Sequence, residues 1–390
     1  MAPPKPHTPT FLESPETTAR FLRDISTTRE IAVDTEGASF HRFVDRIYLL
    51  QLSTRDRTAI IDPLAVPQLD GLGALMERRD VEVVFHDADY DLRLLRQDYG
   101  WDVVRIFDTR VAAQLLGIRA FGLAALLERY FGVKLEKKYQ RADWSLRPLT
   151  PGMLEYAAQD TMYLLDLRDR MRDELARAGR LAWAEEEFEI SQGVRWEPED
   201  PAASFLRIKG TRDLNRRELA VFRELVRWRD GIAAELDRAT FRVVGNEPLL
   251  EVAHRQPRDR KGLAAIKGMP KGMIDQQTAD IVAAIERGLE VPEADLPRFA
   301  KGRRWDRDPD FDARVSALKT ARDEMAGKLA MDPGVLCAKD RLEAVARRSP
   351  ETAEQLGEVS ELRNWQREAL GPAFLSALKP HRADSPYRDS

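Results

Sequence analysis

The feature that most constrains this chain is an apolar strand with two acids at its end. Ile31, Ala32 and Val33 form the kind of run that fills a sheet core, and Asp34 and Glu36 follow it two residues apart. Strand side chains alternate, so both carboxylates lie on one face. Two such carboxylates repel each other and resist desolvation, and a divalent cation is the usual compensation. Taken alone, the pattern also fits a strand that runs into a solvated acidic turn.

Length and composition narrow the class of protein. A chain of 390 residues predicts two or three domains, and 43% hydrophobic with 33% charged residues is typical of a soluble globular protein. The single cysteine, Cys337, excludes an intramolecular disulfide and a Cys-rich zinc site, and it indicates a reducing, cytoplasmic location. The Pro-rich start is no signal peptide, and no apolar run is long enough for a membrane span. The net charge of −4 neither supports nor excludes a polyanionic partner.

The first half of the chain predicts an α/β domain. Apolar runs at 31–36, 47–52 and 58–63 suit a three-stranded antiparallel meander, and a helix at 68–78 leads to a parallel fourth strand at 81–86. A short strand is expected at 106–109, and helices are expected within 11–30 and at 90–100, 110–116, 123–131 and 150–163. Residues 1–192 are therefore predicted to form a mixed sheet flanked by helices.

The second half predicts two all-α helical bundles. A polar linker at 193–212 precedes helices in 214–236, from 248, at 262–266 and at 275–288, and a second linker covers 292–309. The helical unit then recurs at an offset of 93, as Leu263 and Leu356 show, although 250–253 matches 342–346 one residue out of step. We expect bundles at 211–291 and 308–380 and a disordered tail at 381–390.

Further acids stand where they can join Asp34 and Glu36. Asp87, Asp89 and Asp91 follow the fourth strand and compete for a place beside the first, although each can also be a helix cap. Tyr156 and Asp160 share a helix face, with two alanines between them that permit a close approach. Without the other acids, that pair most often forms a surface hydrogen bond.

Together these motifs resemble those of the DEDD exonucleases, in the tyrosine-bearing branch, and the whole chain resembles the ribonuclease D family. The likeness covers nearly all of residues 11–180, including 33–36, 86–92, 106–109, 143–149 and 155–160. It selects Asp91 over its two rivals, and Glu155, where the other branch has His, implies the tyrosine branch. The helical repeats resemble HRDC domains, which also occur in RecQ-type helicases, and the second copy is the weaker match.

The resemblance implies an RNase H-like exonuclease fold and a 3′-to-5′ exoribonuclease that hydrolyses phosphodiester bonds by a two-metal mechanism. The expected products are nucleoside 5′-monophosphates, and the expected substrates are precursor tRNA 3′ ends and other structured RNA. Asp34, Glu36 and Asp160 are expected to hold one Mg²⁺ or Mn²⁺, and Asp34 the second, with Asp91 acting largely through water. Tyr156 would orient the attacking water, because a pKa near 10 makes it a poor base.

Residues around these acids are candidates for contact with the substrate. Phe40 and His86 are expected against the terminal nucleotide, while Trp144 either packs beneath the site or stacks on a base. The side chains expected to reach phosphates are Lys137, Lys138, Arg141 and Arg147. Residues 254–271 carry six Lys or Arg against one acid, which fits a phosphate-tracking patch or a solvated loop.

Three other functions remain open at this point. A DNA proofreading or repair exonuclease belongs to the same class of enzyme. A catalytically inactive nucleic-acid-binding adaptor is disfavoured because the five catalytic residues Asp34, Glu36, Asp91, Tyr156 and Asp160 are all present. A metal-free scaffold for protein partners would show no stabilisation by Mn²⁺. We expect no obligate protein partner, and a monomer.

Overall fold

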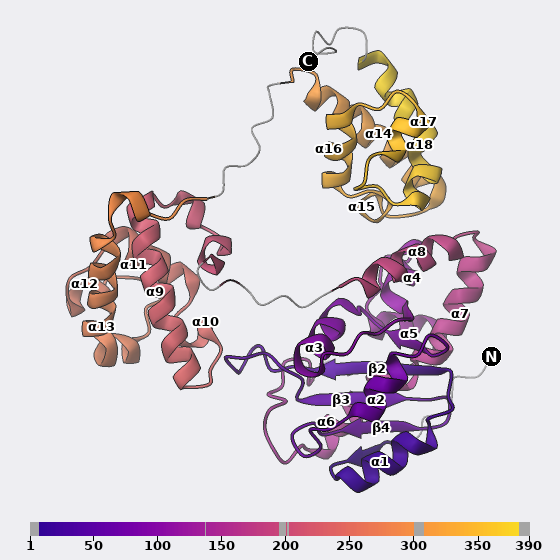
Figure 1. Cartoon of the computed structure of the whole chain (residues 1–390), viewed down its shortest axis with the longest axis horizontal. Coiled ribbons are helices and arrows are strands. Elements are labelled where there is room, and N and C mark those ends of the chain that lie inside the picture. Colours follow the sequence, from indigo (N-terminus) through magenta and orange to yellow (C-terminus); the bar gives the residue numbers. More distant parts are fainter. Residues whose placement is uncertain (1–7, 137, 195–199, 201–202, 300–307, 382–390) are drawn as a thin grey trace.

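The protein consists of a sheet domain followed by two helical domains (Figure 1). The computed structural model describes residues 8–136, 138–194, 200, 203–299 and 308–381. We refer to residues 8–194 as the sheet domain, to 203–299 as the first helical domain and to 308–381 as the second helical domain. The predicted fold class is confirmed. The predicted disorder of the tail concerns residues that, from 382 on, lie outside the described ones.

The sheet has six strands in the order β1-β4-β3-β2-β5-β6. As predicted, β2, β3 and β4 form an antiparallel meander, and β5 lies parallel to β2. β6 adds a further parallel edge strand beside β5. The strand bounds are β1 Thr10–Leu12, β2 Glu30–Glu36, β3 Leu49–Ser53, β4 Thr58–Ile61, β5 Glu82–Phe85 and β6 Ile106–Asp108.

The start of the chain differs from the prediction. We expected a helix within 11–30, but Thr10–Leu12, which was not predicted as a strand, pairs in parallel with β4 at the edge of the sheet. The helix α1 begins only at Pro15, because Ser14 adopts an extended backbone and its side chain accepts a hydrogen bond from the Thr17 N–H. Three residues are too few to show a strand period, so only the sheet partner reveals this strand.

In the described part of the sheet domain, eight helices surround the sheet, and α6 places two candidate residues. Ala157 and Ala158 are fully buried, in one apolar cluster with Leu49 of β3 and Ile60 of β4. The small alanine side chains let the helix approach the sheet closely, which brings Tyr156 and Asp160 toward the end of β2. The helix bounds are α1 Pro15–Asp24, α2 Asp70–Met76, α3 Asp89–Tyr99, α4 Thr109–Leu115, α5 Leu123–Phe131, α6 Pro151–Met162, α7 Leu164–Arg177 and α8 Leu181–Gln192.

The two helical domains repeat one architecture. Four of the five paired helices begin 93 residues apart, at 240 and 333, 246 and 339, 260 and 353, and 271 and 364. The first domain contains α9 Arg216–Glu235, α10 Thr240–Val243, α11 Asn246–Arg255, α12 Arg260–Ala264 and α13 Lys271–Glu290. The second contains α14 Phe311–Leu329, α15 Pro333–Leu336, α16 Lys339–Arg348, α17 Ala353–Gly357 and α18 Asn364–Leu378.

The structure corrects three details of the predicted repeat. Buried Leu249 corresponds to buried Leu342, so the repeat stays in step and the one-residue shift was wrong. The short helices α10 and α15 were not predicted, because four residues show no helical period. Part of the predicted linker at 193–212 belongs to the first helical domain, where Phe205 is buried in the core.

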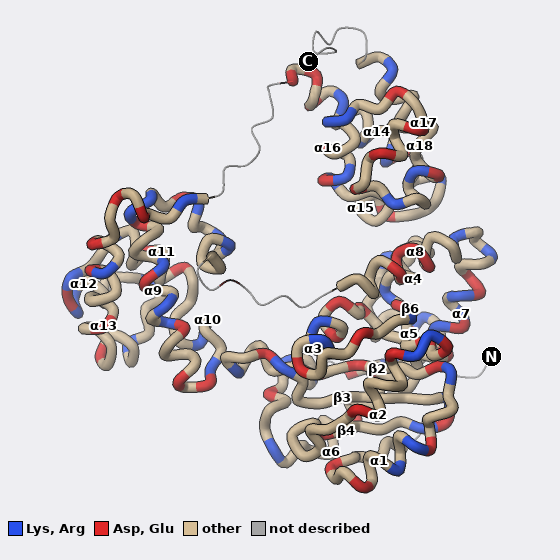
Figure 2. The backbone as a smooth tube through the Cα atoms, in the orientation of Figure 1, with Lys and Arg blue, Asp and Glu red and all other residues tan. Residues whose placement is uncertain are grey.

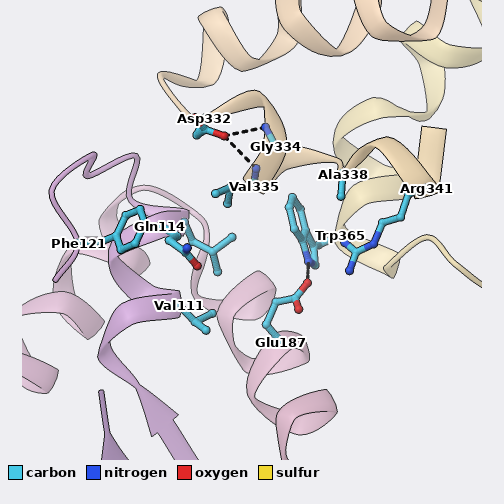
Figure 3. A pocket seen from close by; sticks show the side chains of 11 residues that line it. Val111, Gln114, Phe121, Glu187, Asp332, Gly334, Val335, Ala338, Arg341 and Trp365 are labelled. Atoms are coloured by element: carbon cyan, nitrogen blue, oxygen red, sulfur yellow. Dashed lines mark hydrogen bonds between the residues drawn. The ribbon is translucent and has the colours of Figure 1, made fainter. Parts of the chain in front are cut away.

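The second helical domain packs directly on the sheet domain. Trp183 stacks on Trp365 with ring centroids 4.9 Å apart, and the Trp365 indole N–H donates to Glu187 Oε1 at 2.8 Å. Figure 3 shows Glu187 and Trp365 meeting across this contact. One continuous apolar cluster includes buried residues of both domains, so they share a core. Within the described part of the chain, no helix combines the length and the apolar character needed to cross a bilayer.

Candidate active site

Three acidic side chains meet where β2 ends. Ile31, Ala32 and Val33 are fully buried, and the strand period then places Asp34 and Glu36 on the face toward α6. Asp160 approaches from α6, and ligand oxygens of Asp34, Glu36 and Asp160 lie within 4.8 Å of one another. All three residues are half-buried. The structure thus brings together an acid pair and a third acid that are about 125 residues apart in the chain.

The electrostatics of this cluster are unfavourable without a cation. Burial and the charge of Asp160 raise the pKa of Asp34 well above its ordinary value. Burial and the charges of Asp34, Asp160 and Asp91 do the same to the pKa of Glu36. The pKa of Asp160 rises to about 7 through burial and the charge of Asp91. Every influence on these three groups disfavours their charged forms, so a bound cation would relieve a repulsion that the protein itself leaves uncompensated.

Asp91 joins the cluster through Thr35. Its Oδ1 accepts hydrogen bonds from the Thr35 main-chain N–H at 2.9 Å and from the Thr35 hydroxyl at 2.6 Å. Asp91 is buried, and burial together with the charge of Asp34 raises its pKa despite these two donors. The rival acids are engaged elsewhere: Asp87 pairs with Arg110, and Asp89 with Arg93. Of the three acids in this turn, Asp91 is therefore the one held beside Asp34.

The turn that carries Asp91 is fixed by Asp108. The Asp108 carboxylate accepts hydrogen bonds from the N–H groups of Asp87 and Ala88, at 3.0 and 2.9 Å. It also caps α4 by accepting from the N–H groups of Arg110 and Val111. The sequence pattern did not indicate this link to the neighbouring turn. One buried carboxylate thus ties the start of α3 to the start of α4.

Tyr156 stands beside the acids on α6. Its ring centroid lies 6.1 Å from that of Trp144 and 5.9 Å from that of Tyr139. Burial and the charges of Asp160, Glu36 and Asp34 raise the pKa of Tyr156 above its ordinary value of 10. The phenol therefore stays protonated at neutral pH and can donate a hydrogen bond but not act as a base.

A cleft lies immediately beyond Glu36. Its volume is about 260 Å³. Three of the predicted substrate residues line it: Phe40, Arg141 and Trp144. Phe40 is exposed, with the Arg141 guanidinium carbon 5.6 Å from its ring centroid, so both side chains are accessible to a ligand. The other lining residues are Thr35, Glu36, Gly37, Ala38, Ser39, His41, Tyr90, Gln140 and Ala142.

Trp144 lines the cleft but is fully buried, so it packs beneath the site instead of stacking on a base. The remaining predicted substrate residues that the structure describes do not line this cleft. Arg147 binds Asp62 through Nε at 2.6 Å and NH2 at 2.7 Å, which makes it a structural residue and not the predicted phosphate ligand. Lys138 is exposed beside the Tyr139 ring. Lys137 lies outside the described residues.

His86 is engaged behind the turn. A ring nitrogen, Nδ1, lies 2.9 Å from the Thr109 hydroxyl oxygen. Burial and the nearby Arg110 charge lower the His86 pKa to about 4, against the opposing effect of Asp87. The imidazole is thus neutral at physiological pH. His86 is not among the residues that line the cleft beyond Glu36.

The sequence pattern gave no indication of two residues at the site. Thr35 holds Asp91, as described above. Gln51 of β3 pairs in register with Asp34, is fully buried, and its side-chain amide has no hydrogen-bond partner among the described residues. A buried amide without a hydrogen-bond partner is rare, and this one lies directly beside Asp34 in the sheet. Because Gln51 stands alone in the apolar run 47–52, the sequence did not indicate that it lies at the site.

The donor set fits divalent cations. Hard ions such as Mg²⁺ and Mn²⁺ prefer carboxylate oxygens, and the cluster of Asp34, Glu36 and Asp160 offers several within a short distance. Asp91 keeps Oδ2 available, because both Thr35 donors use Oδ1. The electrostatic repulsion described above is the observation that supports a bound cation.

Family models match most of the chain. Residues 9–176 match the model described as 3′-5′ exonuclease. Residues 218–285 and 311–378 each match the HRDC domain model. The second helical repeat is thus an HRDC domain in its own right.

Two related proteins match over nearly the whole chain. The chain is 30% identical over 375 residues to ribonuclease D of Granulibacter bethesdensis, covering 95% of this chain and 92% of that protein. It is 32% identical over 352 residues to ribonuclease D of Nitrobacter hamburgensis, covering 90% and 89%. Among solved structures, Escherichia coli RNase D has a TM-score of 0.74 at 24% identity, covering 96% of this chain and 99% of that one, which supports the fold. The catalytic core of RRP6 from Trypanosoma brucei has a TM-score of 0.64 at 27% identity, covering 74% and 83%.

Proposed function

The chain belongs to the ribonuclease D family, and on that premise we propose that it is a metal-dependent 3′-to-5′ exoribonuclease whose catalytic residues are Asp34, Glu36, Asp91, Tyr156 and Asp160. The reaction is hydrolysis of the terminal phosphodiester bond, with release of nucleoside 5′-monophosphates. The observation that carries the assignment of the site is the cluster of Asp34, Glu36 and Asp160, whose oxygens converge within 4.8 Å while every electrostatic influence opposes their ionisation.

In this proposal Asp34, Glu36 and Asp160 hold one divalent ion, and Asp34, with Asp91 acting largely through water, holds a second. Bound Mg²⁺ or Mn²⁺ would supply an activated water and stabilise charge on the leaving oxygen. Thr35 contributes by fixing the Asp91 carboxylate through two hydrogen bonds.

Tyr156 acts as a hydrogen-bond donor in this arrangement. Its raised pKa keeps the proton on the phenol, so the hydroxyl orients the attacking water and does not deprotonate it. The half-buried ring is held by Trp144 and Tyr139, which limits the positions that the hydroxyl can take. A fixed donor of this kind lowers the entropic cost of bringing the water into line.

The substrate is RNA, and within it we propose the 3′ ends of precursor tRNA and other structured RNAs. The support comes from the ribonuclease D relatives and from the HRDC matches in both helical domains. Exposed basic residues around α12, visible at the edge of the first helical domain in Figure 2, give that domain a surface suited to phosphates. Of the six Lys and Arg residues within 254–271, two already form ion pairs, Arg255 with Glu251 and Arg260 with Asp275.

The test is digestion of a 3′-extended tRNA precursor with Mg²⁺, Mn²⁺ or chelator, with the products sized. We expect stepwise shortening from the 3′ end and mononucleotide release that stop when the metal is removed. Asp34→Asn and Asp160→Asn should abolish cleavage while RNA binding is largely retained. Near-wild-type cleavage by either variant would contradict the site. A parallel digestion of single-stranded DNA distinguishes a DNA exonuclease, which would degrade the DNA faster.

A further inference from the structure

The first helical domain touches the sheet domain at the loop that follows Glu36. We call residues 236–241 the corner; they comprise the link between α9 and α10 and the first two residues of α10. Within it, Asp237 Oδ1 accepts a hydrogen bond from the Phe43 N–H at 3.3 Å, and Oδ2 accepts from Arg42 NH1 at 3.3 Å. The Ala239 N–H donates to the His41 carbonyl oxygen at 3.1 Å. Figure 1 shows the loop after β2 extending toward α10.

The other side of the same loop rests on the sheet domain. Arg42 Nε donates to the Ser145 hydroxyl at 2.6 Å, and His41 Nε2 lies 3.1 Å from the Arg141 carbonyl oxygen. Arg42 therefore bridges two domains, with Ser145 on one side of its guanidinium and Asp237 on the other. Residues 38–43 are held between the corner and the segment 141–145.

An aromatic contact also links this loop to the corner. Phe241 of the corner meets Phe40 edge-on, with ring centroids 6.4 Å apart and an interplanar angle of 77°. Both rings are about half exposed. Phe40 lines the cleft beyond Glu36, whereas Phe241 does not. The corner thus limits the positions that the Phe40 ring can take. The corner itself does not enter the cleft.

The loop is also fixed where it leaves β2. A side chain at Gly37 would collide with the Tyr90 hydroxyl and with Asp45, so a larger residue there would displace these two side chains. The Tyr90 hydroxyl donates to Asp45 Oδ2 at 2.7 Å, which ties the loop to α3 one residue before Asp91. Displacement of residues 38–43 would consequently alter the cleft close to two of the proposed metal ligands.

We propose that the corner of the first helical domain is a positioning element of the nuclease site. Asp237 and Phe241 hold residues 38–43, and with them Phe40, in the place that receives the terminal nucleotide. This role is separate from RNA binding by the basic surface near α12, and it acts on every 3′ end, including those of RNAs too short to reach that surface. It rests on the proposed function, because it concerns the rate of the same reaction.

The second helical domain supplies an internal comparison. Asp237 corresponds, 93 residues on, to Ala330, and both have left-handed backbones with φ of 42° and 51°. The equivalent corner also contacts the sheet domain: Arg180 NH2 donates to the Leu329 carbonyl oxygen at 2.6 Å, and a side chain at Gly117 would collide with the Ala330 carbonyl. Figure 3 shows the adjoining segment, Asp332 to Val335, facing Gln114 and Phe121 of the sheet domain.

This comparison shows how to test the corner. Alanine already occupies the left-handed position in the second helical domain, so the repeat tolerates it there and Asp237→Ala should fold. The same substitution removes both contacts of the Asp237 carboxylate with the loop. Phe241→Ala removes the ring, and Leu289→Ala, which truncates an exposed side chain of the same domain outside the corner, is the matched control.

The assay uses the full-length protein and a four-nucleotide RNA. We expect Asp237→Ala and Phe241→Ala to lower kcat/KM on this substrate by about fivefold or more, the scale expected when an aromatic or charged contact that fixes a loop is lost. Leu289→Ala should match the wild type. Asp237→Asn, which keeps the Oδ1 acceptor, and Phe241→Tyr, which keeps the ring, should recover most of the rate.

Amide hydrogen exchange gives an independent readout. The Phe43 N–H should exchange faster in Asp237→Ala, while core amides of both domains remain as slow as in the wild type. Unchanged kcat/KM on the short RNA, or a loss confined to long structured RNA, would overturn the proposal. If the wild-type protein cleaves no RNA at all, the proposed function fails, whereas the exchange experiment still reports whether Asp237 holds the loop.

Discussion

The hydroxyl of Thr35 and the main-chain N–H of the same residue both donate to Oδ1 of Asp91, at 2.6 and 2.9 Å. Thr35 lies between Asp34 and Glu36, with its side chain on the opposite face of β2. The strand that carries two of the acids therefore also positions a third, which comes from a different part of the chain.

Removal of the Thr35 hydroxyl should lower the activity of the site, although no proposed metal ligand is substituted. Thr35→Val keeps the shape and the main-chain donor, and we expect kcat/KM to fall about tenfold, since residues that orient metal ligands typically contribute 10–100-fold. Thr35→Ser retains the hydroxyl and serves as the control. When activity is titrated with Mn²⁺, the Mn²⁺ concentration that gives half-maximal activity should be higher for Thr35→Val and unchanged for Thr35→Ser. Equal curves for both variants would contradict a positioning role.

Loss of the Tyr156 hydroxyl should lower the rate of the chemical step. Tyr156→Phe preserves the ring contacts with Trp144 and Tyr139, so we expect kcat to fall about a hundredfold with KM nearly unchanged. Because the Tyr156 pKa is raised, the wild-type pH–rate profile should show no tyrosine ionisation up to pH 10. Tyr139→Phe is the matched control. A rate that falls equally in both variants would indicate a packing effect.

Divalent metal should stabilise the protein, and more so at higher pH. Carboxyl groups with raised pKa values keep protons in the folded state, so the metal-free protein loses stability as pH rises from about 4 through about 7, the pKa of Asp160. Mn²⁺ at a hundred times its Kd should contribute about 2.7 kcal/mol. The rise in Tm should be larger at pH 8 than at pH 6, absent in Asp34→Asn and retained in Asp89→Asn. A metal effect independent of pH would argue against the acid cluster as the binding site.

His86 should make the protein sensitive to mild acid. Its pKa of about 4 lies below the ordinary 6.5, so the folded state binds fewer protons, and stability is lost as pH falls from 6.5 to 4. A difference of about 2.5 pKa units corresponds to about 3 kcal/mol. His86→Gln, which cannot titrate, should lose less stability over this range in urea unfolding. Parallel curves for the two proteins would show that His86 is accessible to protons in the folded state.

Arg147 should matter for stability and not for substrate binding. Its guanidinium is committed to Asp62, a buried residue whose pKa it lowers against the opposing effect of burial. Arg147→Met would leave that carboxylate unpaired, so we expect a loss of roughly 3 kcal/mol in the free energy of unfolding. Arg141→Met, at the cleft, should instead raise KM with little change in stability. A higher KM without destabilisation in Arg147→Met would restore the original phosphate-binding hypothesis.

The spacing of apolar and polar residues predicted helices and strands well where an element is long enough to show its period. The meander β2 to β4 and the shared helix face of Tyr156 and Asp160 follow from such periods, whereas the parallel direction of β5 follows from the helix that leads into it. β1 and α10 escaped prediction because three or four residues show no period. Arg147 was misjudged because its partner Asp62 lies 85 residues away, and a local basic run gives no sign of such a partner.

The contacts between domains had no local signal at all. Phe40 and Phe241 are 201 residues apart, and nothing in either neighbourhood of the sequence indicates that they meet. The same holds for Thr35 and Asp91, whose hydrogen bonds depend on the parallel pairing of β2 with β5. Residue types and spacing indicated which acids gather, whereas the residues that hold them in place emerged only from the three-dimensional structure.

The contact at the corner is small, yet the way the chain is connected makes it effective. Eight residues, 195–202, separate the sheet domain from the first helical domain, and they can span at most roughly 30 Å. Beyond residues 300–307 the chain continues into a domain that is itself packed on the sheet domain. The first helical domain is therefore tethered at both ends, at an effective concentration of millimolar order. An aromatic pair and one carboxylate, too weak to join separate molecules, can then close an intramolecular contact.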